Sequence, residues 1–111
     1  MAEDLSAVTT FPHMARFATG SANALTQIQL PTKATKVTVL FESNDGKVTH
    51  TGTDAAAIGA EFFTVPADAA LEMQVGLGIS ATTTLSIFVT SATGTTSVCV
   101  ILEGQVDMEV D

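Results

Sequence analysis

Apolar residues alternate with polar ones at every second position along most of this chain. A period of two is typical of β-strands with one buried face, whereas an amphipathic helix repeats every three to four residues. Turn residues separate the alternating runs at intervals of roughly ten residues, the rhythm of a sandwich or barrel. The pattern predicts an all-β fold, a compact antiparallel β-sandwich or barrel of about six to eight short strands with flexible terminal arms. The runs are 25–30, 37–42, 48–51, 62–65, 71–77, 84–90 and 98–102.

Three local patterns refine this expectation. The sequence Ser-Asn-Asp-Gly at 43–46 joins two alternating runs, and its residues tolerate the positive φ angles of a tight turn, so it predicts a β-hairpin. Segment 54–60 is the only stretch that permits a helix, of at most about two turns, with Asp54 as a possible N-cap. The run 98–102 is apolar on both faces, because Cys99 and Ile101 alternate with valines and a leucine. It is therefore predicted to be a central or interfacial strand.

The 111 residues are enough for one domain. Residues 1–23 lack strand alternation and are interpreted as an N-terminal arm, residues 24–104 as the β-sandwich or barrel domain, and residues 105–111 as an acidic tail. The tail alternates acidic and apolar residues, so it can pair onto an exposed sheet edge of its own chain or of a neighbour. The predicted contact residues of the two arms are Phe11, Phe17, Val106, Met108 and Val110.

The net charge of −8 is carried by one half of the chain. All four basic residues lie in the first 47 positions, balanced by four acids, and eight carboxylates without a base follow from Val48 onward. This asymmetry argues against nucleic acid and anionic membranes as partners and fits a basic or neutral neighbour. No apolar run approaches the ~20 residues of a bilayer span. The first residues also lack the basic and apolar regions of a secretory signal, so we expect a soluble protein.

Candidate catalytic residues are few. His13 and His50 are the only histidines, and an acyl-transfer site would need one of them beside a nucleophile and an orienting acid. Both are interpreted as packed or surface histidines. Cys99 lies inside an apolar run, so it is expected to be a small buried hydrophobe, and as the single cysteine it has no partner for an internal disulfide. We predict no catalytic residue and no enzymatic activity.

Metal and cofactor sites are not predicted either. One cysteine and two histidines do not supply the ligands of a usual zinc site within one chain. Calcium prefers oxygen ligands, but the loop carboxylates show no EF-hand spacing and are interpreted as solvated side chains. These carboxylates are Asp45, Asp54, Glu61 and Asp68.

Segments 36–47, 51–60 and 64–68 together resemble the small head-decoration (cement) and accessory virion proteins of tailed bacteriophages, above all in the run Thr-Asp-Ala-Ala-Ala-Ile-Gly at 53–59. The resemblance covers about the middle third of the chain and brings no catalytic residues. It implies a structural protein on the capsid surface, made in the host cytoplasm, that associates with itself, a trimer being favoured. It also implies docking to the major capsid protein or a neighbouring virion protein. The acidic tail departs from the family, so the mode of attachment is open.

Two alternatives come from other functional classes. One is a small-ligand or carbohydrate-binding β-sandwich module, with Phe88 and the loops at Asp54 and Gly76 as its mouth. The absence of Trp and Tyr disfavours it, because sugar-binding sites usually stack rings on such side chains. The other is an acid-dependent hydrolase that uses Asp54 and Glu61, although nothing in the sequence shows that the two carboxylates converge.

Overall fold

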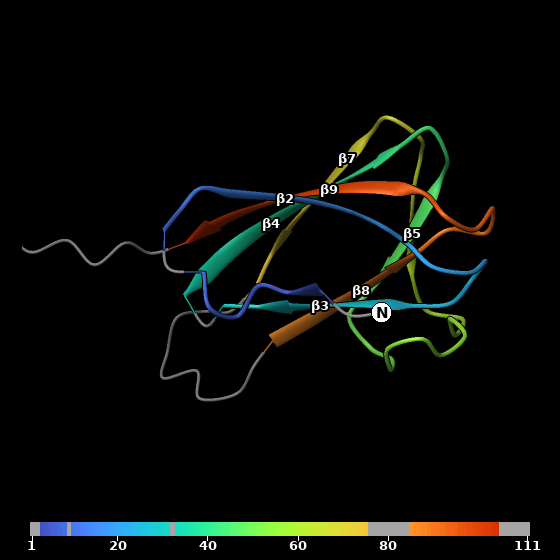
Figure 1. The fold of residues 1–111 in the computed structure, drawn as a ribbon, viewed down its shortest axis with the longest axis horizontal. Helices are drawn as coiled ribbons and strands as arrows, with labels where there is room; N and C mark the ends of the chain where they lie inside the picture. The colour runs from blue at the N-terminus through green and yellow to red at the C-terminus, as the bar shows by residue number, and fades with distance from the viewer. Residues whose placement is uncertain (1–2, 9, 32, 76–84, 105–111) are drawn as a thin grey trace, which may run out of the picture.

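Two β-sheets stacked face to face form the protein in a computed structural model, which describes residues 3–8, 10–31, 33–75 and 85–104 (Figure 1). The first sheet has the strand order β1-β3-β8-β5-β6 and the second the order β2-β9-β4-β7. No helix occurs within these residues, and the sheets remain open, so the prediction of an all-β sandwich is confirmed and the barrel option is not. The strands are β1 (Glu3–Asp4), β2 (His13–Ala18), β3 (Thr26–Leu30), β4 (Ala34–Glu42), β5 (Gly46–Thr49), β6 (Phe63–Val65), β7 (Ala70–Gln74), β8 (Leu85–Thr90) and β9 (Ser97–Gly104).

The hydrophobic core lies between the sheets and is built by the predicted alternation. In β4 and β9 every second side chain points inward and is completely buried, as Val39 and Val100 show. From the first sheet, Ile28, Val48 and Val89 join the same apolar cluster. Burying a side chain of this size stabilises the fold by roughly 1.5–3 kcal/mol relative to leaving it in water. Burial of these alternating apolar side chains is thus the main source of the fold's stability.

Strand β9 is an inner strand of the second sheet, as predicted from its two apolar faces. It pairs antiparallel with β2 on one side and with β4 on the other. Its inward residues are in the core, while Cys99 and Ile101 point to the outer face of the sheet. Cys99 is buried even there, so its interpretation as a small buried hydrophobe is confirmed.

The predicted hairpin at residues 43–46 is wrong. Strands β4 and β5 flank this connection, but β4 pairs with β7 and β9 in one sheet, whereas β5 pairs with β6 and β8 in the other. The chain therefore arches from one sheet to the other, with Ser43 at a positive φ of 80°. The Phe41 ring is fully buried and packs on Gly46, where a Cβ atom would overlap it. The turn residues at 43–46 permit a hairpin or an arch. The arch forms because it lets the apolar faces of the two sheets cover each other.

Segment 1–23 contributes two strands to the sandwich. β1 pairs parallel with β3, whereas every other strand pair is antiparallel, and β2 pairs antiparallel with β9. Phe11 and Phe17, predicted as arm contacts, are both partly buried against the core cluster. Phe11 also lies against Gly104, where an added Cβ atom would be 2.8 Å from its ring. The other predicted contacts, Val106, Met108 and Val110, lie outside the described residues.

The helix-permissive segment 54–60 is a loop. The backbone at Ala55 has a positive φ of 67°, and its N–H donates to the carbonyl of Leu25 at 2.7 Å. Asp54 accepts the backbone N–H of Gln27 at 3.0 Å with Oδ1, so its carboxylate binds a neighbouring strand and caps no helix. These bonds fasten the loop to the start of β3.

Candidate interaction surfaces

The outer face of the second sheet carries an apolar patch, formed by Met14, Leu40, Cys99 and Ile101 and called the outer patch below. The strand register places Met14 beside Ile101 and Cys99 beside Leu40 on this face. Met14 is 64% exposed, among the most exposed large hydrophobic residues described. Met14 is thus the most exposed member of the outer patch, whereas Cys99 is 6% exposed.

Ion pairs flank the outer patch on both sides. Arg16 Nε lies 3.3 Å from Glu42 Oε1, which joins β2 to the end of β4. Lys36 Nζ lies 3.3 Å from Glu72 Oε1 and 3.4 Å from Glu103 Oε2, which joins β4 to β7 and β9. The hydrogen bond to Glu72 and the charge of Glu103 raise the pKa of Lys36. Two of the four basic residues of the chain thus lie on this one face, and its local charge is close to balance.

Strand β2 is the open edge beside the outer patch. Among the described residues it pairs with β9 alone, so one side of its backbone has no strand partner. It is six residues long and carries Arg16 and His13 but no carboxylate. Open strand edges are templates for pairing with another segment. β2 itself holds no acid, and its Arg16 pairs with Glu42 of β4, so this edge is less acidic than the chain as a whole.

A second apolar surface lies at β6, the end strand of the first sheet. Phe63 is 62% exposed and Phe62 is 36% exposed. They line a hollow of about 190 Å³ together with Val48, Thr49, His50 and Glu61. The Lys47 ammonium lies 4.8 Å from the centroid of the Phe62 ring, a cation–π contact. Two exposed neighbours are not expected from strand alternation, which predicts that one of two adjacent residues is buried.

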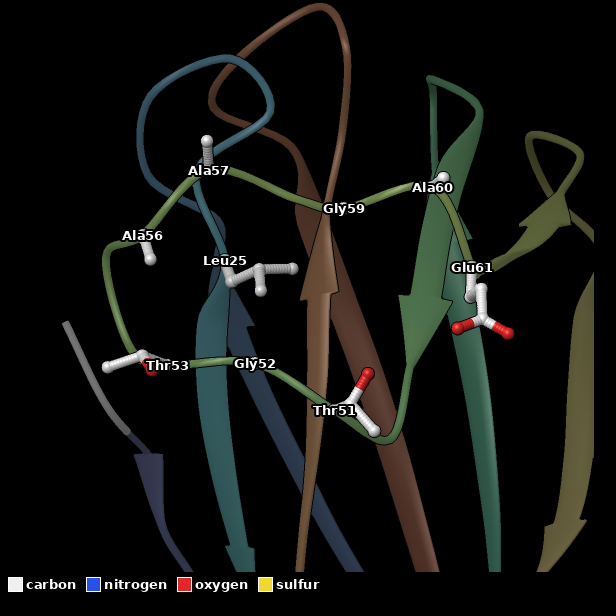
Figure 2. Close-up of a pocket in the computed structure, with 9 residues that line it drawn as sticks. All are labelled: Leu25, Thr51, Gly52, Thr53, Ala56, Ala57, Gly59, Ala60 and Glu61. Atoms are coloured by element: carbon white, nitrogen blue, oxygen red, sulfur yellow. The ribbon is translucent and has the colours of Figure 1, made fainter.

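A second hollow, of about 340 Å³, lies under the loop that connects β5 with β6 (Figure 2). Figure 2 shows the Leu25 side chain inside the ring of the loop, with Thr53 and Ala56 on one side and the Glu61 carboxylate on the other. The remaining lining residues are small: Thr51, Gly52, Ala57, Gly59 and Ala60. Glu61 is the only ionisable side chain in this lining, since Asp54 is not part of it.

Phe88 is not available as a stacking surface. It lies on the outer face of its sheet, as the alternation of β8 suggests, but only 6% of it is exposed. Gly52 of the covering loop lies over it, and a Cβ at that position would come within 3.9 Å of the Phe88 ring. Phe88 therefore offers no open ring to a ligand, because the loop covers it, and the loop at Gly76, predicted as part of the same mouth, lies outside the described residues.

The candidate catalytic residues are dispersed over the fold. His13 lies in β2 of the second sheet, His50 directly follows β5 of the first sheet, and Cys99 lies in β9 on the outer face. Within the described ranges, no three His, Cys, Asp or Glu side chains are grouped so that they could hold a metal ion. No helix long and apolar enough to cross a bilayer occurs in the same ranges.

Comparison with known protein families, with curated proteins and with solved structures finds no match to this chain.

Proposed function

We propose that this protein is a structural component of a tailed-bacteriophage particle, a capsid decoration (cement) protein. It acts by self-association and by docking to the major capsid protein or a neighbouring virion protein. The resemblance of segments 36–47, 51–60 and 64–68 to that family supports the phage assignment and favours a trimer.

One structural observation carries the proposal of a contact function. The exposed large hydrophobic residues of the described chain are Met14, Phe62 and Phe63, and they lie on or beside β2 and β6. These strands end the two different sheets. A single chain therefore offers two separate apolar surfaces next to open strand edges. A subunit that joins copies of itself and also binds a shell needs at least two such surfaces.

The charges of the chain indicate what kind of surface the second partner presents. The net charge of −8 repels other acidic surfaces, whereas Lys47 beside Phe62 and Arg16 beside Met14 place positive groups at the two apolar surfaces. Neutral or mixed-charge protein surfaces fit these sites better than nucleic acid does.

The test is binding of the purified protein to phage shells that lack it, together with sedimentation over a wide concentration range. We expect saturable binding and a mass above that of the monomer. The double variant Phe62→Ser/Phe63→Ser should weaken shell binding by about tenfold or more, because it removes an apolar contact surface. Ala92→Ser, an exposed change in the β8–β9 connection, is the matched control. A protein that stays monomeric and binds no shell contradicts the proposal.

Carbohydrate or small-ligand binding is the alternative, and the hollow beneath the β5–β6 loop is what favours it. The burial of Phe88 removes the ring on which a sugar would stack. Screening on a glycan array discriminates the two functions. A hit that is lost in Glu61→Gln, with shell binding unchanged, would favour the alternative.

A further inference from the structure

We propose that segment 105–111 of one copy adds as an antiparallel strand to the open edge of β2 in a second copy. This inference rests on the proposed function, since it names the contact that joins copies of the chain. The two sheets have four edge strands in the described part of the chain, β1, β6, β2 and β7.

The four edges differ in length and charge. β1 has two residues and β6 has three, which is too short to hold a seven-residue strand. β7 has five residues and carries Glu72, which shares Lys36 with Glu103, so two acids face one base beside this edge. β2 has six residues and no carboxylate, and its Arg16 pairs with one acid, Glu42 of β4. Segment 105–111 contains three acids and no base. Length and charge therefore select β2.

The alternation of the segment also matches that of β2. In β2, Ala15 and Phe17 face the core, whereas Met14 and Arg16 face outward. When Asp107 lies opposite Arg16, the acids of the segment share the outer face with that guanidinium. Its apolar residues then extend the core face, because directly opposed residues in an antiparallel pair point the same way. This register pairs Val106 with Phe17, Asp107 with Arg16, Met108 with Ala15, Glu109 with Met14 and Val110 with His13.

A second copy fits this edge better than the segment's own chain. β9 ends at Gly104, next to the start of β2, since Leu102 lies opposite His13. Strands lie ~4.8 Å apart, so passing around β2 to its free edge spans roughly 10 Å and uses about three residues. About four residues would remain, and they would run parallel to β2. The segment of a second copy can use all its residues in the antiparallel direction.

Cross-linking between differently marked chains tests this directly. Full-length Arg16→Cys and Asp107→Cys variants, like the control below, carry Cys99→Ala, because Cys99 lies opposite Arg16 and would otherwise bridge to it within one chain. The two variants are mixed, oxidised and analysed by non-reducing electrophoresis and mass spectrometry. We expect a bridge between positions 16 and 107 of different chains, because opposed residues in a strand pair lie within disulfide range. Lys36→Cys mixed with Asp107→Cys is the matched control. Lys36 carries the same charge on the same sheet but lies on β4, separated from β2 by β9. The control should cross-link at least about tenfold less.

Charge reversal provides an independent measurement. In about 0.15 M salt, which screens the overall repulsion between chains, Arg16→Glu and Asp107→Lys should each weaken self-association severalfold, because each places like charges opposite one another. The mixture of the two variants should recover part of that loss. Lys36→Glu should change it less.

Each outcome has one interpretation. Self-association without a 16–107 bridge and without sensitivity to these charges overturns the inference and leaves the proposed function standing. A bridge that forms only within a single chain carrying both cysteines also overturns it. Failure of the full-length protein to associate and to bind shells contradicts the proposed function itself.

Discussion

At the scale of single residues, the passage of the chain from one sheet to the other depends on the missing side chain of Gly46. Its backbone packs on the Phe41 ring, which is fully buried. We predict that Gly46→Ala lowers the free energy of unfolding by about 1–3 kcal/mol, because the added methyl overlaps the ring and forces the core to shift. Urea denaturation followed by circular dichroism measures this, since the chain has no Trp or Tyr.

Gly59→Ala is the matched control for this prediction. Nothing lies within 4 Å of a Cβ at this loop position, and its φ is not in the left-handed region. The substitution should leave stability unchanged or raise it by about 0.5 kcal/mol, through the lower entropy of the unfolded chain. Equal losses at positions 46 and 59 would contradict the packing argument.

Asp54 gives a residue-scale prediction on pH. The backbone N–H of Gln27 donates to its carboxylate and lowers its pKa in the folded protein. A pKa below that of the unfolded chain means that the carboxylate contributes stability above the unfolded pKa, near 4, and loses it as the pH falls through the folded value. Asp54→Asn should therefore reduce the loss of stability between pH 7 and pH 3. Urea midpoints at several pH values would show this, and identical pH profiles would contradict it.

At the scale of elements, the two faces of strand β9 differ in burial. Val100 is completely buried between the sheets, whereas the neighbouring Ile101 is partly exposed in the outer patch. We predict that Val100→Ala lowers the free energy of unfolding by about 2–3 kcal/mol and that Ile101→Ala costs only about 1 kcal/mol, although it removes more atoms. Denaturation at low protein concentration measures both. The reverse order would mean that the two faces of β9 are assigned wrongly.

At the scale of the whole molecule, the charge of −8 opposes association between copies. Salt at 0.1 M reduces the range of this repulsion to about 10 Å, while apolar and backbone contacts persist. One Arg16–Asp107 pair is a small attraction beside eight net charges on each chain. Raising the salt concentration from about 0.02 to about 0.15 M should therefore tighten self-association, as measured by sedimentation equilibrium. Weaker association would mean that ion pairs between copies outweigh the overall repulsion.

The sequence alone is enough to predict most of the segments that form strands. Alternation with a period of two is a local property, and it correctly located β3, β4, β8 and β9 and the all-β class. It missed β2, because the run His-Met-Ala-Arg-Phe-Ala contains no β-branched residue and its small alanines weaken the alternation.

Sheet membership and the candidate surfaces were decided only by the tertiary structure. The turn at 43–46 suits a hairpin and an arch equally, and pairings between residues far apart in the chain, Phe41 with Val98 in one sheet and Val48 with Val89 in the other, give the arch. The same pairings make β2 and β6 the end strands, and the loop over Phe88 hides a ring that looks exposed in the sequence. The physical reason is that alternation records which side of a strand avoids water. What covers that side, and which strand is left without a neighbour, depends on contacts across the whole chain.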